Sequence, residues 1–347
     1  MDVVNPTTTG ISIVEYKAIV DNFIYYVKND FYMTNILKSM AIVNLGLCCI
    51  NNTLRKNNIF NSRTCIRRTY SVEKAKELAL KNVRDLIPMI EWNNQNNIKC
   101  FRLTSNLFPH FTDSEVESYT IDFAKPDLKI AGDLAKKYGM RILMHPGQFN
   151  QVGAKNPKVF QKTIDQLSHL AEILDAMGID YNGVLIIHGG GMYGDKKKTM
   201  VRWVKQFMIL PEIVRRRLVL EHCERCYSLR EVLSISLTLK KRGYSLPVVF
   251  DSHHFDCYDE LHPDEKSLNF QKLAPIIIRS WGDRRPLMHV SNQGSGRVGH
   301  HSDFITNFPS YFFHVRDVLG VSFDVEVEAK AKEAAIFALR DLEPTLE

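Results

Sequence analysis

The stretch Val184-Leu185-Ile186-Ile187-His188 is an apolar run that ends on a residue able to bind a metal ion. Apolar runs of this length are typical of strands buried on both faces, as in a parallel sheet. Four more runs share the design and end on His, Asp or Glu, and a sixth is more mixed; they are 140–145, 218–221, 247–251, 286–289 and 323–328. A parallel barrel displays its chemistry at the C-terminal ends of its strands. The repetition therefore predicts a multi-metal site at the mouth of a barrel.

Strand-like and helical segments alternate from residue 41 onward. Strands are expected at 41–46, 99–103, 141–145, 184–188, 218–221, 247–251, 286–290 and 322–327. Helices are expected near 72–92, 119–138, 157–177, 197–215, 228–242, 266–279, 302–318 and 330–341. Ser71 and Ser228 are predicted N-caps, and Gly139, Gly178 and Gly243 fall where helices should end. Eight strands, each followed by a helix, predict an α/β fold of the (β/α)8 TIM-barrel type over residues 41–347. A doubly wound sheet is the alternative, but it rarely takes ligands from six strand ends.

Residues 1–40 are expected to form an N-terminal extension. Residues 14–37 could make a helix, whose stripe of Tyr16, Phe23 and Tyr26 is interpreted as a packing face rather than a binding platform. The first ten residues carry little that could form a core.

Composition limits the classes of protein to consider. The chain has 347 residues, of which 45% are hydrophobic, yet no run approaches the roughly 18 apolar residues that span a membrane. The N-terminus lacks the design of a secretory signal. Seven cysteines without a repeated CxxC array argue against a disulfide framework or a zinc ribbon and favour an intracellular, reducing compartment. The pair Cys223 and Cys226 is interpreted as incidental.

Basic residues indicate an anionic partner. The formal net charge is +6. The stretch 31–72 contains no Asp or Glu, and its cations include Arg55, Lys56, Arg67 and Arg68. A second basic stretch runs from Lys196 to Lys205. Both are expected in loops on the same side as the strand-end ligands, which favours a phosphate backbone as the partner.

The strand-end residues suit divalent metals. A carboxylate such as Glu221 after a buried strand costs several kcal/mol unless it is paired or metal-bound. Mixed imidazole and carboxylate ligation suits zinc or manganese. With at least seven candidate ligands, two or three ions must share the mouth, and Glu221 is the natural bridge. Such a cluster clamps both oxygens of a phosphoryl displacement and activates water, so no Ser or Cys nucleophile is required.

Several motifs together resemble the UV damage endonuclease family. They are His-Pro-Gly-Gln-Phe at 145–149, Leu-Glu-His-Cys-Glu-Arg at 220–225, Phe-Asp-Ser-His-His at 250–254, Val-Glu-Ala-Lys-Ala-Lys-Glu at 327–333, Phe-Arg-Leu-Thr-Ser-Asn-Leu-Phe-Pro at 101–109 and Asn-Leu-Gly at 44–46. The resemblance covers about residues 41–335. It implies a metal-dependent TIM-barrel DNA repair enzyme that nicks DNA 5′ to cyclobutane dimers and (6-4) photoproducts. Damaged double-stranded DNA is then the expected partner, and a monomer the expected state.

The resemblance also assigns roles by position. His145, His188 and Glu221 correspond to the ligands of one metal. Glu221, Asp251, His289 and Glu328 correspond to a second shell, and His254 and His301 to a third. Glu221, His254, His301 and Lys330 are the expected catalytic residues. Lesion or DNA contacts are expected from Asn51, Gln148, Phe149, Arg55, Lys56, Arg67 and Arg68.

The chain departs from the family pattern in three respects. Where a His of the family completes the first metal shell, this chain offers Asp113, with His110 as the alternative. Leu287 stands where some members carry a lysine that can be modified, so that modification cannot occur. Two tyrosines associated with damage probing align with Leu47 and Phe149.

Two other kinds of protein remain possible from the sequence. The first is a different enzyme on the same barrel, either an AP endonuclease or a metal-dependent sugar isomerase. An isomerase, however, gains nothing from the basic loop. The second is a lesion-binding protein with a degenerate site. The retention of Glu221, Asp251 and Glu328 argues against it, because binding alone needs no three desolvated carboxylates.

Overall fold

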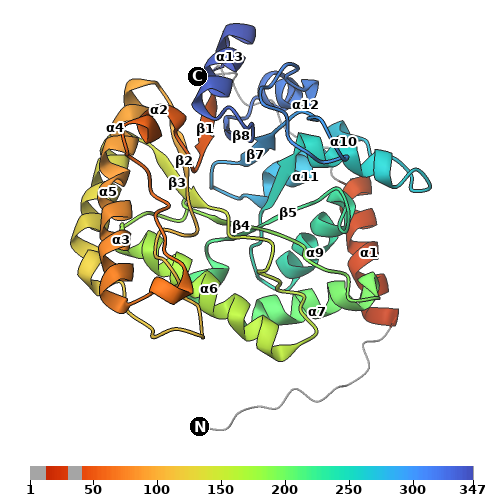
Figure 1. The fold of residues 1–347 in the computed structure, drawn as a ribbon. Coiled ribbons are helices and arrows are strands. Elements are labelled where there is room, and N and C mark those ends of the chain that lie inside the picture. The colour runs from red at the N-terminus through yellow and green to blue at the C-terminus, as the bar shows by residue number, and fades with distance from the viewer. Residues whose placement is uncertain (1–12, 30–40, 347) are drawn as a thin grey trace.

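The computed structural model describes residues 13–29 and 41–346, and its centre is a closed barrel of eight parallel strands. The strands follow one another around the barrel in chain order, and β1 closes against β8 (Figure 1). They are β1 Val43–Cys48, β2 Cys100–Leu103, β3 Arg141–Met144, β4 Leu185–His188, β5 Leu218–Glu221, β6 Val248–Asp251, β7 Leu287–Val290 and β8 Phe323–Val327. The predicted (β/α)8 barrel is confirmed.

The side chains of each strand point alternately out of the barrel and into it, so the barrel has an outer and an inner hydrophobic core. Outward residues such as Leu45 and Phe101 join the large core under the surrounding helices. Inward residues such as Leu143 and Val219 form a smaller cluster inside the barrel, which is closed by Trp281. Leu287 belongs to this inner cluster, so the position at which some family members carry a modifiable lysine is apolar in this chain.

Helices surround the barrel (Figure 1). They are α2 Asn52–Lys56, α3 Val72–Arg84, α4 Leu86–Gln95, α5 Lys125–Lys137, α6 Pro157–Ala176, α7 Lys196–Met208, α8 Glu212–Arg215, α9 Leu229–Lys241, α10 Ser252–Leu261, α11 Phe270–Ser280, α12 Ser310–Phe313 and α13 Glu333–Leu342. Ser71 accepts a hydrogen bond from Lys74 N, and Ser228 forms a capping box with Glu231. Gly139, Gly178 and Gly243 have positive φ, as a helix C-terminus requires. No helix within the described ranges is both long and apolar enough to span a bilayer.

One expected helix is shorter in the structure, and the helix that directly follows β6 was not expected. The helix expected at 302–318 begins only at Ser310, because Asn292 Oδ1 accepts hydrogen bonds from Thr306 N and Asn307 N and holds that segment as a loop. Helix α10 was not predicted. It follows β6 directly, and its N-cap is Asp251, whose carboxylate accepts a hydrogen bond from His254 N at 2.8 Å.

The N-terminal helix α1, Ile13–Asn29, lies on the outside of the barrel beside α9 (Figure 1). Phe23 is buried and Tyr16 packs against the same core, so the packing interpretation of these two residues is confirmed. Polar contacts add to this packing: Asn22 Nδ2 donates to Thr238 Oγ1 at 3.4 Å, and Lys205 pairs with Glu15 at 2.9 Å. The side chain of Tyr26 and residues 30–37 of the expected helix lie outside the described part.

Candidate metal centre

The strand-end residues reach the barrel mouth because they continue the inward-facing positions. His145, Glu221 and His289 each stand two residues after an inner-core residue: Leu143, Val219 and Leu287. Strand register then sets them at matching heights, since His188 pairs with Glu221 and Asp251 pairs with His289. The ligands of neighbouring strands therefore converge on the axis of the barrel.

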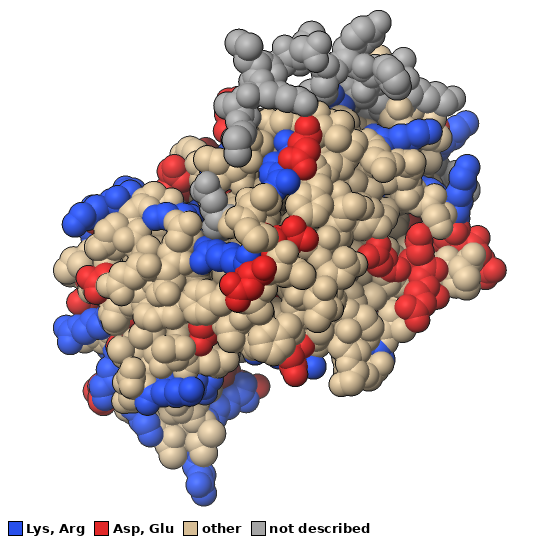
Figure 2. All heavy atoms as spheres, turned by 90° about the horizontal axis from the view of Figure 1, so that it is seen from above, with Lys and Arg blue, Asp and Glu red and all other residues tan. Residues whose placement is uncertain are grey.

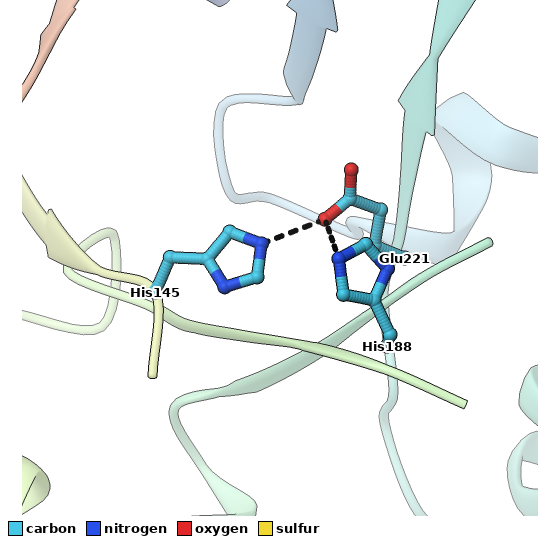
Figure 3. Close-up of side chains that lie close together, drawn as sticks. All are labelled: His145, His188 and Glu221. Atoms are coloured by element: carbon cyan, nitrogen blue, oxygen red, sulfur yellow. Dashed lines mark hydrogen bonds and ion pairs between the residues drawn. The ribbon is translucent and has the colours of Figure 1, made fainter. Parts of the chain in front are cut away.

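The first group consists of His145, His188 and Glu221 (Figure 3). Nε2 of His145 lies 3.0 Å from Glu221 Oε2, and Nε2 of His188 lies 3.7 Å from the same oxygen. One ligand atom from each residue falls within 4.8 Å of the others. Three elements of the fold thus direct their side chains at a single point.

Two further groups are linked to the first, because the second group shares Glu221 with the first and Asp251 with the third. Glu221, Asp251 and His254 form the second, and Asp251, His289 and Glu328 form the third. The other Glu221 oxygen, Oε1, lies 3.8 Å from His254 Nε2 and 2.9 Å from His289 Nδ1. The structure therefore places Glu221 between groups, as predicted for a bridge, and gives Asp251 the same position between the second and third. His254 joins Glu221 and Asp251 rather than His301.

The charges of the site stabilise one another. Burial alone would favour a neutral Glu221, yet the facing His289 and His188 hold the pKa of that carboxyl well below its usual range. Burial opposes a charged imidazole at His289, but Glu221 and Glu328 raise its pKa well above the ordinary value. Burial lowers the pKa of His188. Ionised carboxylates thus stand at the mouth with histidines on either side.

The donor set fits divalent cations. Asp251 is fully buried, and its Oδ2 has no hydrogen-bond partner among the described residues. This oxygen lies 3.9 Å from His289 Nδ1 and 4.0 Å from His254 Nε2. A buried anionic oxygen without a donor is costly unless a cation satisfies it. Carboxylate and imidazole ligands in this mixture suit zinc or manganese.

Two residues beneath the ligands were missed in the sequence. Arg102 on β2 donates to Glu326 through Nε at 2.8 Å and Nη2 at 2.7 Å, and it also pairs with Glu328. Glu326 Oε2 lies 2.9 Å from His289 Nε2, on the far side of the ring from Glu221. A carboxylate behind a ligating imidazole fixes its orientation. The signal was available in β8, where Asp324, Glu326 and Glu328 alternate along one face.

Glu224 is a third residue that sequence reasoning did not assign. Its Oε2 lies 3.1 Å from His254 Nδ1, which leaves Nε2 facing Glu221 and Asp251. Burial opposes a charged His254, but Asp251, Glu224 and Glu221 raise the pKa of the ring to about 10. Glu224 therefore orients His254 as Glu326 orients His289.

Some predicted ligands lie apart from the three groups. Asp113 pairs with Arg67 at 2.8 Å and with His110 at 3.1 Å, while His110 Nε2 lies 2.6 Å from Cys65 O. Neither side chain joins a ligand group among the described residues, so the role of Asp113 or His110 as a metal ligand stays a prediction. His301 Nε2 lies 3.8 Å from Glu328 Oε2 but belongs to none of the described groups.

Lys330 is exposed, and only its backbone N–H makes a described hydrogen bond, to Ser302 O at 3.1 Å. A direct role at the ligand groups therefore stays a prediction.

A cavity of about 580 Å³ opens beside the first group. Its wall consists of the loop 145–151, the glycines after His188 and the loop 223–226. Phe149 is 79% exposed and Gln148 is exposed next to it. Gln151 braces the loop, because its Oε1 accepts hydrogen bonds from Gly191 N at 3.2 Å and from the Tyr193 hydroxyl.

The two other positions predicted near a lesion are buried. Asn51 is 1% exposed and caps α2 by accepting a hydrogen bond from Leu54 N at 2.9 Å, although its Nδ2 has no described partner. Leu47 is 1% exposed in β1 and faces the outer core. A position inside the barrel wall cannot touch DNA, so the alignment of Leu47 with a damage-probing tyrosine does not carry that role here.

The basic residues predicted to contact DNA follow β1 at the same end of the barrel. Arg55 and Lys56 end α2, and Arg67 and Arg68 lie in a single 3-10 turn. Arg67 is neutralised by Asp113 and Glu115. Arg63, by contrast, is structural: it pairs with Asp85 at 2.7 Å and stacks over Phe60.

A closed parallel barrel with three overlapping imidazole–carboxylate groups at its C-terminal mouth defines a class of barrel proteins with a candidate multi-metal centre. Within that class, the family model for UV-endonuclease UvdE matches residues 43–346. The chain belongs to the UV-endonuclease UvdE family, which confirms the resemblance carried by its motifs.

Individual relatives agree with this assignment. A protein of Acanthamoeba polyphaga mimivirus, provisionally named UV-damage endonuclease, is 35% identical over 308 residues, covering 86% of this chain and 90% of the viral protein. The UV-damage endonuclease of Schizosaccharomyces pombe is 34% identical over 312 residues, covering 85% of this chain and 50% of that protein. The crystal structure of SacUVDE matches with a TM-score of 0.74 at 26% identity, over 86% of this chain and 99% of that chain.

Proposed function

We propose that this protein nicks the DNA backbone 5′ to UV photoproducts, with water activated by two or three divalent metal ions. The observation that carries the proposal is the set of three ligand groups joined through Glu221 and Asp251 at the barrel mouth. Membership of the UvdE family supports DNA as the substrate. The names of relatives, which refer to UV damage, support photoproducts as the lesion.

His145, His188, Glu221, Asp251, His254, His289 and Glu328 would hold the ions. Bound there, the ions would supply Lewis acidity to a phosphate and a nucleophilic water at neutral pH. The protein contributes the positions of the ligands: Glu326 and Glu224 hold two imidazoles in place, and Glu221 stays ionised at the centre. Lys330 and His301 are also proposed to take part in catalysis, through contacts with the bound substrate.

The direct test uses the full-length protein and a duplex oligonucleotide with one cyclobutane dimer. After removal of metals by chelation, Mn²⁺ or Zn²⁺ is added and the products are separated on a denaturing gel. One cut at the phosphodiester 5′ to the dimer, dependent on added metal, is expected. Matched duplexes with an abasic site or with no lesion serve as controls. Cleavage of the abasic duplex alone would indicate an AP endonuclease, and binding without cleavage would indicate a lesion-binding protein.

The loop after β1 is proposed to contact the DNA backbone. On the side seen in Figure 2, Lys and Arg are interspersed with Asp and Glu, so the net charge of +6 does not form a uniform basic coat there. We therefore expect particular lysine and arginine side chains of this loop, rather than the overall charge, to contact the phosphates. We expect neutralisation of Arg55, Lys56 and Arg68 to weaken binding of damaged and undamaged duplexes alike, and to flatten the salt dependence by about 0.9 per lost phosphate contact.

Arg67 offers a matched comparison, because Asp113 and Glu115 already neutralise it. Arg67→Gln should change binding less than Arg68→Gln when both are measured by fluorescence anisotropy over a range of salt concentrations. If the variant with Arg55, Lys56 and Arg68 neutralised shows the same salt dependence of DNA binding as wild type, the loop does not contact the DNA backbone.

Phe149 is proposed as the wedge that holds a distorted lesion open. It is the exposed aromatic ring on the cavity wall, beside Gln148. Stacking of a base on an aromatic ring contributes roughly 1–3 kcal/mol, whereas a net hydrogen bond contributes about 0.5–1.5 kcal/mol. Phe149→Ala should therefore weaken binding to photoproduct DNA by about 5- to 150-fold. Gln148→Ala should have a smaller effect.

Phe149→Tyr is the control for this prediction, since it keeps the stacking face and should be nearly neutral. Affinity is measured for the dimer duplex and for the undamaged duplex. Equal loss for both duplexes, or no loss for either, would place the wedge elsewhere.

A further inference from the structure

A pair of cysteines lies in the loop between β5 and α9, at the wall of the cavity beside the metal ligands. Cys223 and Cys226 both line this cavity. The loop is closed on itself, because Cys223 N donates to Tyr227 O at 2.9 Å. The backbone N–H groups of Cys226 and Tyr227 also donate to Cys223 Sγ, at 3.3 and 3.4 Å. The turn therefore wraps around one sulfur and brings the second cysteine to the same side.

The 3.3 Å approach of Cys226 N to Cys223 Sγ places the two cysteines next to each other in one tight turn. The neighbouring Cys223 thiol and the charges of Lys196 and Arg225 lower the pKa of Cys226 to about 7, although burial opposes this change. Cys223 and Cys226 are both half-buried. Two half-buried thiols in one turn, one of them with a lowered pKa, form a pair that can be oxidised and reduced.

The other cysteines lack this combination. Cys48, Cys100 and Cys257 are buried, and burial raises the pKa of each thiol. Cys49 is half-buried, and burial raises its pKa to about 11. Cys65 is half-buried and stands in a different loop, where its carbonyl contacts His110. Cys65 is therefore a matched control for accessibility without a neighbouring thiol.

We propose that Cys223 and Cys226 are a redox modification site that forms a reversible disulfide, with a low-molecular-weight disulfide of the glutathione type as oxidant. The Cys226 thiolate attacks one sulfur of glutathione disulfide, and one glutathione leaves as its thiol. The Cys223 thiol then loses its proton and attacks Cys226 Sγ, and the second glutathione leaves. Two cysteine thiols are oxidised while one glutathione disulfide is reduced to two glutathiones. This chemistry goes beyond the proposed nuclease activity and does not depend on it.

The position of the pair connects this modification to the metal centre. Glu224 stands between the two cysteines in the chain and orients His254 at 3.1 Å. A disulfide across residues 223–226 changes the backbone on both sides of Glu224, so the carboxylate is drawn away from the ring. Loss of a carboxylate behind a ligating His lowers metal affinity by about 10–100-fold. Oxidation should therefore weaken metal binding at the group containing His254.

The first experiment tests whether the bond forms. The full-length protein is equilibrated in glutathione and glutathione disulfide mixtures of increasing oxidising strength, its free thiols are alkylated, and peptides are identified by mass spectrometry. The Cys223–Cys226 disulfide should be the first protein disulfide to appear, in wild type and in Cys65→Ser, and reducing agent should reverse it. Alkylatable Cys223 and Cys226 after other thiols have oxidised would overturn the proposal, as would a glutathione adduct on Cys226 that never resolves.

The second experiment tests the connection to the metal centre, with Mn²⁺ binding to reduced and oxidised protein measured by calorimetry. Oxidised wild type should bind about 10–100-fold more weakly than reduced, whereas Cys223→Ala/Cys226→Ala should bind equally in both conditions. Equal affinity in oxidised and reduced wild type would overturn the connection through Glu224. Failure of the protein to nick photoproduct DNA would leave both redox measurements intact, so the two proposals fail separately.

Discussion

Glu221→Gln is expected to leave the barrel folded and to reduce nicking of photoproduct DNA by more than about 10³-fold. Glu221 belongs to two ligand groups and uses both oxygens: Oε2 faces His145 and His188, and Oε1 faces His289 and His254. An amide has the same shape but replaces one anionic oxygen with an N–H donor, which repels a cation. Two groups therefore lose a ligand through a single substitution.

Single-turnover cleavage of the dimer duplex measures this effect, and metal content of the purified variant gives a second reading. Glu115→Gln is the control, because Glu115 is exposed and lies outside the ligand groups in the described part of the chain. Circular dichroism should show an unchanged fold for both variants. Nicking by Glu221→Gln at the wild-type rate, or full wild-type activity after exhaustive chelation, would exclude the multi-metal mechanism.

Arg102→Met is expected to reduce the free energy of unfolding of the metal-free protein by about 3–5 kcal/mol. Arg102 is buried and pairs with the buried Glu326 and with Glu328. Methionine fills similar space but leaves the carboxylates without their counter-charge. Removal of one partner from a buried ion pair is costly for this reason, even where the intact pair contributes little.

Urea denaturation in a chelating buffer measures the change. Arg102→Met/Glu326→Gln should recover part of the lost stability, because one of the uncompensated charges is removed with the arginine. Added Mn²⁺ should also reduce the difference in the free energy of unfolding between Arg102→Met and wild type. A single variant that unfolds at the wild-type urea concentration would show that solvent already screens these carboxylates.

The sequence predicted the barrel and most of the residues in its candidate ligand groups, because both depend on a local, periodic signal. Apolar runs of a strand's length mark the barrel wall, and side chains alternate with period two, so the ligand at a strand end continues the inward face. Leu143 and His145 follow this rule, as do Val219 and Glu221. Ser71 and Ser228 were predictable for a similar reason, since a cap and its helix are adjacent in sequence.

Residues whose role depends on a partner far along the chain were not predictable in this way. Arg102 meets Glu326 across 224 positions of sequence, and nothing near either residue indicates the other. Asp113 had the spacing of a ligand, but its pairing with Arg67, 46 positions earlier, draws it away from the ligand groups. Leu47 aligns with a tyrosine associated with damage probing, yet its place in β1 puts it against the outer core. Tertiary contacts decide such cases.

The pairing of Arg102 with Glu328 has a consequence for how the third ligand group would bind a metal ion. The Arg102 guanidinium already pairs with Glu328, the carboxylate that is proposed to bind a metal ion. A metal ion bound by Glu328 would compete with the Arg102 guanidinium for this carboxylate, and Glu326 would hold the guanidinium inside the barrel. In the absence of a metal ion, the guanidinium offsets the repulsion between the carboxylates of Glu326 and Glu328. Supply of the ion, rather than completion of the fold, would then determine when the centre becomes active.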